Sequence, residues 1–271
     1  MSPSESTPIE LETPAGRLAL TDEGPADAPA LVCFHGSPGS HRDCRHLAPL
    51  LAGPLRVLRL DLPGFGNSPV PDGFDPTLVG RAAILPALLD TLGLDRAAVL
   101  GHSMGGGIAT AAAVSHPDRV SALVLLASAG PRPHRGIRAL SPLRLNLILA
   151  GIAIPGVRDL LLPRLREAWK RARFPGAERM PLEDFRFQLS LVRALDFDGH
   201  KERLQRVAVP TLVAWAEDDH LIEPEVSREL FAAIPGARPL TFPTGGHNLQ
   251  KTQAEAVAAA ILALLAPPGE A

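Results

Sequence analysis

Ser103 stands between two glycines in the run Gly101-His102-Ser103-Met104-Gly105. A serine hydroxyl becomes a nucleophile when a histidine removes its proton and a carboxylate orients that histidine. The apolar residues before this run predict a buried strand, and the Ala-rich segment 108–114 predicts a helix. A strand that passes into a helix so quickly turns sharply, and glycines remove the Cβ atoms that would clash there. The pattern predicts a nucleophile elbow that exposes the Ser103 hydroxyl, and its alternative is an ordinary turn whose serine caps a helix.

A histidine and two acidic residues follow later predicted strands. His247 lies in a Gly-Gly loop, and it alone among the nine histidines follows the last strand. Asp218 and Asp219 come directly after the predicted strand 210–216. Only one of two adjacent side chains can point at the imidazole, and the distance from the strand end favours Asp219 over Asp218. Because the carboxyl ends of parallel strands meet at one sheet edge, Ser103, Asp219 and His247 are expected to converge.

A second Gly- and Pro-rich turn, His35-Gly-Ser-Pro-Gly39, follows a continuous apolar run. Acyl transfer needs two N–H donors for the oxyanion of its tetrahedral intermediate. We predict that the backbone N–H groups of Ser37 and Met104 are these donors, since Pro38 has no N–H. Two further residues beside these donors are predicted to line the substrate site, namely Gly36 and His102.

Strands and helices alternate over the first half of the chain after an opening hairpin, which predicts a parallel α/β sheet. One of the helices is expected to run from Leu78 to Leu92 and to end at Gly93. The segment 131–206 shows no clear strand pattern and is rich in Leu and Arg, so it predicts several short helices. We therefore predict an α/β fold with a mostly parallel, doubly wound, eight-stranded sheet. Residues 1–130 and 207–271 form its core, and residues 131–206 form an inserted helical cap, a lid over the site.

The composition is that of a globular protein. The chain has 271 residues, of which 46% are hydrophobic and 21% charged. No apolar run reaches the roughly 18 residues of a membrane span. The first 15 residues show no secretory signal, and two cysteines, Cys33 and Cys44, form no disulfide framework. The expectation is a cytoplasmic protein without a transmembrane segment, and its net charge of −2 gives no general attraction to nucleic acid.

Positive charge is concentrated in the segment 131–206, which holds 16 Lys or Arg against 8 Asp or Glu. This excess is typical of solvated helix faces, but it also suits the steering of an anionic substrate or contact with a membrane surface. The same segment carries two apolar stretches, Leu140–Ile154 and Phe185–Leu195. They either face an acyl chain or pack against the core.

Taken together, these motifs resemble the α/β-hydrolase superfamily in its capped form over nearly the whole chain. In this family the triad acid usually ends a Gly-x-x-Asp motif. Ala216 takes the place of the glycine in this chain, and counting from it makes Asp219 the acid. The resemblance implies a triad of Ser103, Asp219 and His247 that needs no cofactor or metal, with the Ser37 and Met104 amides as oxyanion donors. The motifs that carry the resemblance are His35-Gly-Ser-Pro-Gly39, Asp61-Leu-Pro-Gly-Phe-Gly-Asn-Ser68, Gly101-His-Ser-Met-Gly-Gly106, Ala216-Glu-Asp-Asp219 with Pro224, and Gly246-His247.

The residues and the resemblance predict a serine hydrolase that cleaves small to medium carboxylic esters through an acyl-enzyme, a carboxylesterase. Its substrate is expected to be a small molecule, either anionic or with an apolar acyl chain. Ser103 argues against epoxide hydrolases and haloalkane dehalogenases of this fold, because these use an aspartate nucleophile. The oligomeric state has no signature in the sequence.

Several alternatives stay open. Carbon–carbon hydrolases share Ser-Met-Gly-Gly, but they usually carry Asn before the serine and Trp after the histidine. This chain has His102 and Asn248 at those positions. Amidases or iminopeptidases and haloperoxidase-like relatives share the triad. A ligand-binding protein without catalysis on the same fold is the remaining alternative.

Overall fold

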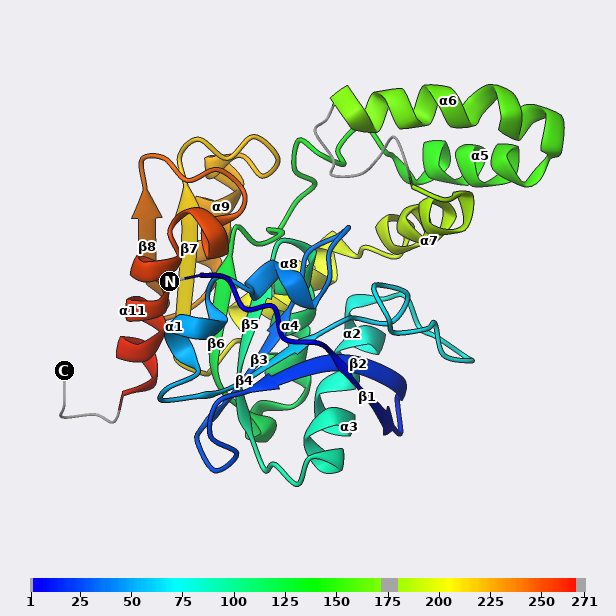
Figure 1. Ribbon diagram of the computed structural model, residues 1–271. Helices are drawn as coiled ribbons and strands as arrows, with labels where there is room; N and C mark the ends of the chain where they lie inside the picture. The colour runs from blue at the N-terminus through cyan, green and yellow to red at the C-terminus, as the bar shows by residue number, and fades with distance from the viewer. Residues whose placement is uncertain (1, 172–179, 267–271) are drawn as a thin grey trace.

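The computed structural model describes residues 2–171 and 180–266, and an eight-stranded sheet lies at its centre (Figure 1). The strand order is β1-β2-β4-β3-β5-β6-β7-β8. β2 pairs antiparallel with both β1 and β4, and all the other neighbours are parallel. This confirms the predicted fold class. The strands are β1 (Ile9–Thr13), β2 (Gly16–Glu23), β3 (Ala30–Phe34), β4 (Arg56–Leu60), β5 (Ala97–His102), β6 (Val120–Leu126), β7 (Thr211–Ala216) and β8 (Arg238–Phe242).

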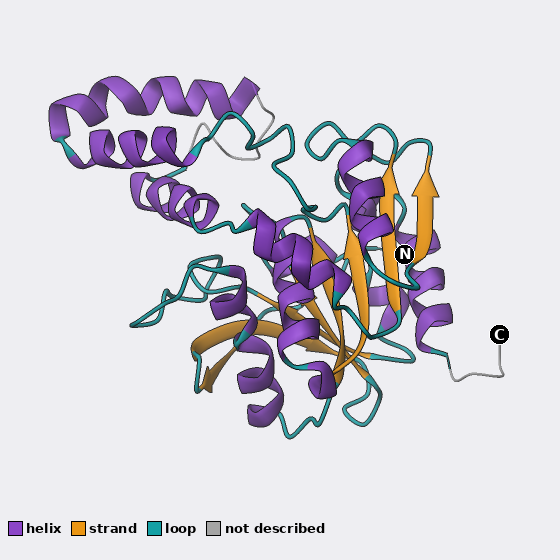
Figure 2. Cartoon of the chain, turned by 180° about the vertical axis from the view of Figure 1, so that it is seen from behind, coloured by secondary structure: helices purple, strands orange, loops and turns teal. Residues whose placement is uncertain are grey.

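Helices cover both faces of the sheet (Figure 2). Successive side chains of a strand point to opposite faces, so Val32 and Phe34 face one helical layer while Leu31 and Cys33 face the other. The first layer includes α2 (Leu78–Ala82), α3 (Ile84–Thr91), α4 (Met104–Ser115), α8 (Phe197–Gln205) and α9 (Pro224–Ala233). The second includes α1 (Ala48–Leu51), α10 (Leu249–Thr252) and α11 (Ala254–Leu265). Two short 3₁₀ helices are His41–Cys44 and Pro117–Arg119.

The predicted single helix from Leu78 to Leu92 is divided in the structure. α2 ends at Ala82 and α3 begins at Ile84. The physical reason is Pro86, which has no N–H to donate to the carbonyl of Ala82 four residues earlier.

Four helices follow β6 and precede β7 in the described chain. They are α5 (Pro142–Ala153), α6 (Pro155–Arg171), α7 (Leu182–Arg193) and α8. α5 and α6 lie side by side and project away from the sheet, with α7 beneath them (Figures 1 and 2). α5, α6 and α7 share a small apolar core of their own. Residues 172–179 lie outside the described part, and the division of the chain at 130/131 and 206/207 stays a prediction. None of the described helices has the length and hydrophobicity to cross a bilayer.

Candidate active site

Ser103 occupies a sharp turn between β5 and α4. Its backbone has φ 54° and ψ −119°, a conformation that costs energy for any residue except glycine. A Cβ atom on Gly101 would lie 2.5 Å from the carbonyl oxygen of Gly105, and one on Gly105 would lie 2.3 Å from that of Phe34. Both positions therefore require glycine if the turn is to approach its neighbours so closely.

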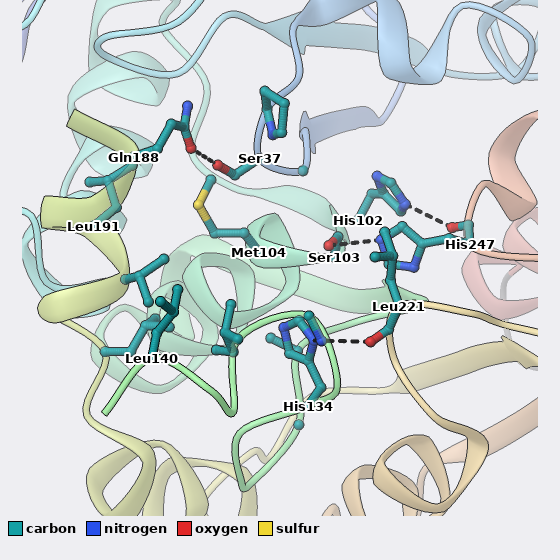
Figure 3. Close-up of a pocket in the computed structure, with 18 of the residues that line it drawn as sticks. Ser37, His102, Ser103, Met104, His134, Leu140, Gln188, Leu191, Leu221 and His247 are labelled. Atoms are coloured by element: carbon teal, nitrogen blue, oxygen red, sulfur yellow. Dashed lines mark hydrogen bonds between the residues drawn. The ribbon is translucent and has the colours of Figure 1, made fainter. Parts of the chain in front are cut away.

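The structure brings Ser103, His247 and Asp219 into one hydrogen-bonded chain. Figure 3 shows the part of this chain between Ser103 and His247. Nε2 of His247 lies 3.0 Å from Oγ of Ser103, and Nδ1 lies 2.8 Å from Oδ2 of Asp219. Both His247 and Asp219 are buried. A proton on Nδ1, held by the carboxylate, leaves Nε2 free to accept the serine proton. This arrangement can activate a serine hydroxyl.

The two adjacent acidic residues have different partners. The second carboxylate oxygen of Asp219 accepts hydrogen bonds from the N–H groups of Leu221, at 2.8 Å, and Ile222, at 3.1 Å. Asp218 instead accepts hydrogen bonds from the N–H groups of Gly245, at 2.9 Å, and Gly246, at 2.7 Å. Asp219 therefore contacts the imidazole, whereas Asp218 holds the loop that carries it.

The environment shifts the pKa values of this acid and this base. Burial lowers the pKa of His247 below its ordinary value of 6.5, although the hydrogen bond with Asp219 acts in the opposite direction. Burial alone would raise the pKa of Asp219, but its hydrogen bonds from His247, Leu221 and Ile222 bring that pKa below its ordinary value. At neutral pH the site thus holds a neutral imidazole beside a carboxylate.

The predicted oxyanion donors lie beside Ser103. The N–H of Met104 is the first of α4 and has no acceptor within that helix. The N–H of Ser37 has no hydrogen-bond acceptor among residues 2–171 and 180–266. A Cβ on Gly36 would lie 3.1 Å from Cβ of Ser103, so glycine at this position allows the turn to approach the serine closely. The hydroxyl of Ser37 donates to Oε1 of Gln188 on α7 (Figure 3).

His102 has protein partners for both ring nitrogens. Nε2 donates to the carbonyl oxygen of His247 at 2.9 Å. Nδ1 lies 3.2 Å from a carboxylate oxygen of Asp43 and 3.3 Å from Nε2 of Gln250. The same Asp43 oxygen accepts the N–H of Gly36 at 3.0 Å. His102 borders the pocket, but these bonds favour a role in holding the His247 loop, and the predicted contact of His102 with substrate stays a prediction.

Several residues near Ser103 were not found from the sequence. His134 and His200 line the same pocket, and burial lowers the pKa of each to about 4, so both are neutral near pH 7. Trp169 on α6 and Gln188 on α7 complete its wall. None of the four belongs to a local motif. Three of them lie on α6, α7 and α8, and His134 lies in the loop before α5, so only the packing of this whole segment brings them to the site.

The pocket beside Ser103 has a volume of about 290 Å³. The charged side chains among its described lining residues are those of Asp43 and Asp196, and no Lys or Arg is found in that described lining. Apolar side chains make up much of the rest, namely Leu78, Met104, Ile137, Leu140, Trp169, Leu191, Val192, Leu195, Phe197 and Leu221. From the two predicted apolar stretches, the apolar side chains in this described lining are Leu140, Leu191, Val192 and Leu195.

Comparisons with known proteins agree with this fold. A family model described as the alpha/beta hydrolase fold matches residues 29–174 and 184–254. A 2-hydroxy-6-oxononadienedioate/2-hydroxy-6-oxononatrienedioate hydrolase of Cupriavidus pinatubonensis is 34% identical over 263 residues, which covers 89% of this chain and 87% of that protein. RutD of Shigella flexneri serotype 5b, described as a putative carbamate hydrolase, is 30% identical over 255 residues, which cover 91% of this chain and 94% of RutD.

Among solved structures, the enol-lactonase from Burkholderia xenovorans LB400 superimposes with a TM-score of 0.74. The superposition covers 95% of this chain and 99% of the enol-lactonase, with 23% sequence identity. A likeness at this identity shows the fold alone.

Proposed function

Because the chain belongs to the α/β-hydrolase family, we propose that it is a serine hydrolase of neutral carboxylic esters with small to medium acyl groups. The observation that carries this proposal is the hydrogen-bonded chain from Ser103 through His247 to Asp219. Two N–H groups that have no acceptor among the described residues, those of Ser37 and Met104, support it, because acyl transfer needs two such donors for its oxyanion. Residence in the cytoplasm remains a part of the same proposal.

The geometry supports a two-step reaction. Oγ of Ser103 attacks the ester carbonyl while Nε2 of His247 takes its proton, and the tetrahedral oxyanion accepts hydrogen bonds from Ser37 and Met104. The intermediate collapses to an acyl-enzyme, and His247 returns the proton to the departing alcohol. Water then attacks the acyl carbonyl with His247 as base, releasing the acid and restoring Ser103. Asp219 holds the imidazole tautomer and stabilises the imidazolium in both steps.

We further propose that the helices between β6 and β7 serve as the cap over this site. α6 and α7 each supply wall residues, Trp169 and Gln188, and Gln188 is bonded to the Ser37 turn. A cap in this position excludes water from the pocket and so strengthens the hydrogen bonds that stabilise the oxyanion.

A carbon–carbon hydrolase is the second candidate, since the relative from Cupriavidus pinatubonensis acts on a dienedioate by its name. A dioate carries two carboxylates, and burying a charge without a partner is costly. The described lining of the pocket offers Asp43 and Asp196 and no cationic Lys or Arg. Of the five histidines in the described lining, His134 and His200 are neutral near pH 7, because burial lowers the pKa of each to about 4. These charges favour a neutral ester over a dianionic substrate.

The proposal is tested with p-nitrophenyl esters from acetate to palmitate. We expect kcat/KM to reach its maximum at a short or medium acyl chain, because a pocket of about 290 Å³ cannot enclose palmitate. p-Nitrophenyl butyrate should exceed p-nitrophenyl hemisuccinate by about tenfold or more, since the latter buries an unpaired carboxylate. A dienedioate and a carbamate are assayed in parallel. Faster turnover of the dienedioate than of every neutral ester would replace the ester proposal with carbon–carbon cleavage.

The lowered pKa of His247 predicts the pH dependence of this activity. Below the pKa of His247 the imidazolium cannot accept the serine proton, so kcat/KM falls as the pH decreases through it. Because burial lowers that pKa, the midpoint of the acid limb is expected below 6.5. The measurement is kcat/KM for the best ester between pH 4 and pH 8, with folding followed by circular dichroism. A midpoint above 6.5 in the folded enzyme would contradict the burial argument.

A further inference from the structure

The helical hairpin of α5 and α6 exposes apolar side chains that the pocket does not use. The described residues include eight large exposed hydrophobic side chains, and five of them belong to this hairpin. The five are Leu143 at 71%, Leu147 at 64%, Ile154 at 57%, Val157 at 39% and Leu160 at 59% exposure. We call these five residues the hairpin patch. Isolated exposed apolar residues are normal, but such a concentration on one projecting element marks an interaction surface.

Three residues of the patch form a second apolar face along α5 and its C-terminal end. Leu143, Leu147 and Ile154 are separated by four and seven residues, so they lie on one side of the helix axis. The opposite side already packs inward through Leu145 and Ile152 in the small core that α5 shares with α6 and α7. A surface helix normally carries polar residues opposite its packed face, and one that is apolar on both faces is normally covered.

Positive charge surrounds this patch. From Pro142 to Arg171 the two helices hold six Lys or Arg and two Asp or Glu. Arg164 lies on the same side of α6 as Val157 and Leu160, one turn further along. Within the described residues, the guanidinium groups of Arg144 and Arg164 bond only backbone carbonyls, those of Ala139 and Leu160, and have no acidic partner.

We propose that the hairpin patch docks on an anionic lipid bilayer. Exposed leucines and isoleucine enter the headgroup boundary, and the surrounding arginines pair with lipid phosphates, as in interfacial amphipathic helices. A second copy of the chain fits less well, because a symmetric pair would bring two positively charged surfaces together. The hairpin also connects to the pocket, since Leu140 just before α5 and Trp169 near the end of α6 both line it.

The test measures co-sedimentation of the full chain carrying Ser103→Ala, so that no lipid is cleaved during the assay. Vesicles of phosphatidylglycerol and phosphatidylcholine in equal parts are compared with pure phosphatidylcholine. We expect binding to the anionic vesicles, weakened on the order of tenfold when NaCl rises from about 0.05 M to about 0.5 M. Equal binding to neutral vesicles, or no binding to either, would overturn the proposal.

Two sets of variants locate the surface. Leu143→Ser/Leu147→Ser/Leu160→Ser is expected to weaken binding by about tenfold or more, because serine removes the buried apolar area. The matched control, Ile9→Ser/Val70→Ser/Val79→Ser, changes three exposed apolar residues elsewhere and is expected to bind like the parent. Equal binding by the patch and control variants would refute the assignment of this surface.

The charge variant Arg144→Gln/Arg164→Gln is expected to lose about fivefold in affinity for each charge removed. Arg42→Gln/Arg238→Gln, which changes two other exposed arginines, is its control. Hydrolysis of a soluble ester by the same variants with Ser103 intact checks folding. If the triple leucine variant does not fold, vesicle binding by Arg144→Gln/Arg164→Gln against its control tests the assignment of this surface. Concentration-dependent dimerisation that the patch substitutions abolish, without vesicle binding, would assign the surface to a second copy instead.

Discussion

Replacing Ser103 by alanine is expected to lower kcat for the best ester by about three to four orders of magnitude or more. Alanine has no hydroxyl to attack the carbonyl, so the acyl-enzyme cannot form. The alanine methyl fits where the serine Cβ already lies, although the strained φ of 54° is kept. The measurement is kcat and KM on the same ester series, with a fluorophosphonate probe as an independent label of the nucleophile.

Ser128→Ala is the matched control for this substitution. Ser128 is buried and lies just after the neighbouring strand β6, and its hydroxyl donates to the carbonyl of Ala129. It is expected to keep kcat within about tenfold of the parent. Equal rates in the parent and in Ser103→Ala would refute Ser103 as the nucleophile. Probe labelling that persists in Ser103→Ala would point to a different serine.

Replacing Asp219 by asparagine is expected to lower kcat by about three to four orders of magnitude while leaving KM nearly unchanged. The amide NH₂ of asparagine would donate to Nδ1 of His247, so the ring proton moves to Nε2. An imidazole with its proton on Nε2 cannot accept the proton of Ser103. The neutral amide also cannot stabilise the imidazolium that forms in the transition state.

Asp218→Asn is the control, because it changes the adjacent residue in the same chemical way. The asparagine oxygen can still accept the N–H groups of Gly245 and Gly246, so the loop that carries His247 is expected to keep its shape. We expect a loss of kcat within about tenfold, since a charged acceptor becomes a neutral one. The assignment of Asp219 would be wrong if Asp218→Asn caused the larger loss of kcat. Steady-state kinetics of both variants, compared at one pH, gives the answer.

The sequence alone predicted where the strands lie along the chain, the eight-stranded and mostly parallel sheet, and the placement of Ser103 and His247 just after two of its strands, whereas the order of the strands in the sheet came from the structure. These features depend on local chemistry. Continuous apolar runs indicate buried strands, and glycines on both sides of Ser103 permit a turn that other residues would obstruct. Such signals lie within a few neighbouring residues and need no knowledge of distant contacts. The comparisons confirm the family, whereas the roles of the individual residues stay predictions for the kinetic tests above.

The tertiary structure decided what local patterns left open. Asp218 and Asp219 are adjacent and chemically identical, and only the folded loop directs one to His247 and the other to Gly245 and Gly246. The predicted helix is likewise divided at Ala83, because Pro86 has no N–H to donate. The periodicity of apolar residues does not reveal such a missing donor.

The Arg-rich segment is the clearest case of this kind. Its excess of positive charge was consistent with steering an anionic substrate, with contact at a membrane or with ordinary solvated helices. In the structure, Arg144 and Arg164 lie exposed on the α5–α6 hairpin, whereas the charged side chains in the described pocket lining are Asp43 and Asp196. Composition records how many charges a segment has. Where those charges lie depends on which helix faces pack together, and packing joins residues that are far apart in the chain.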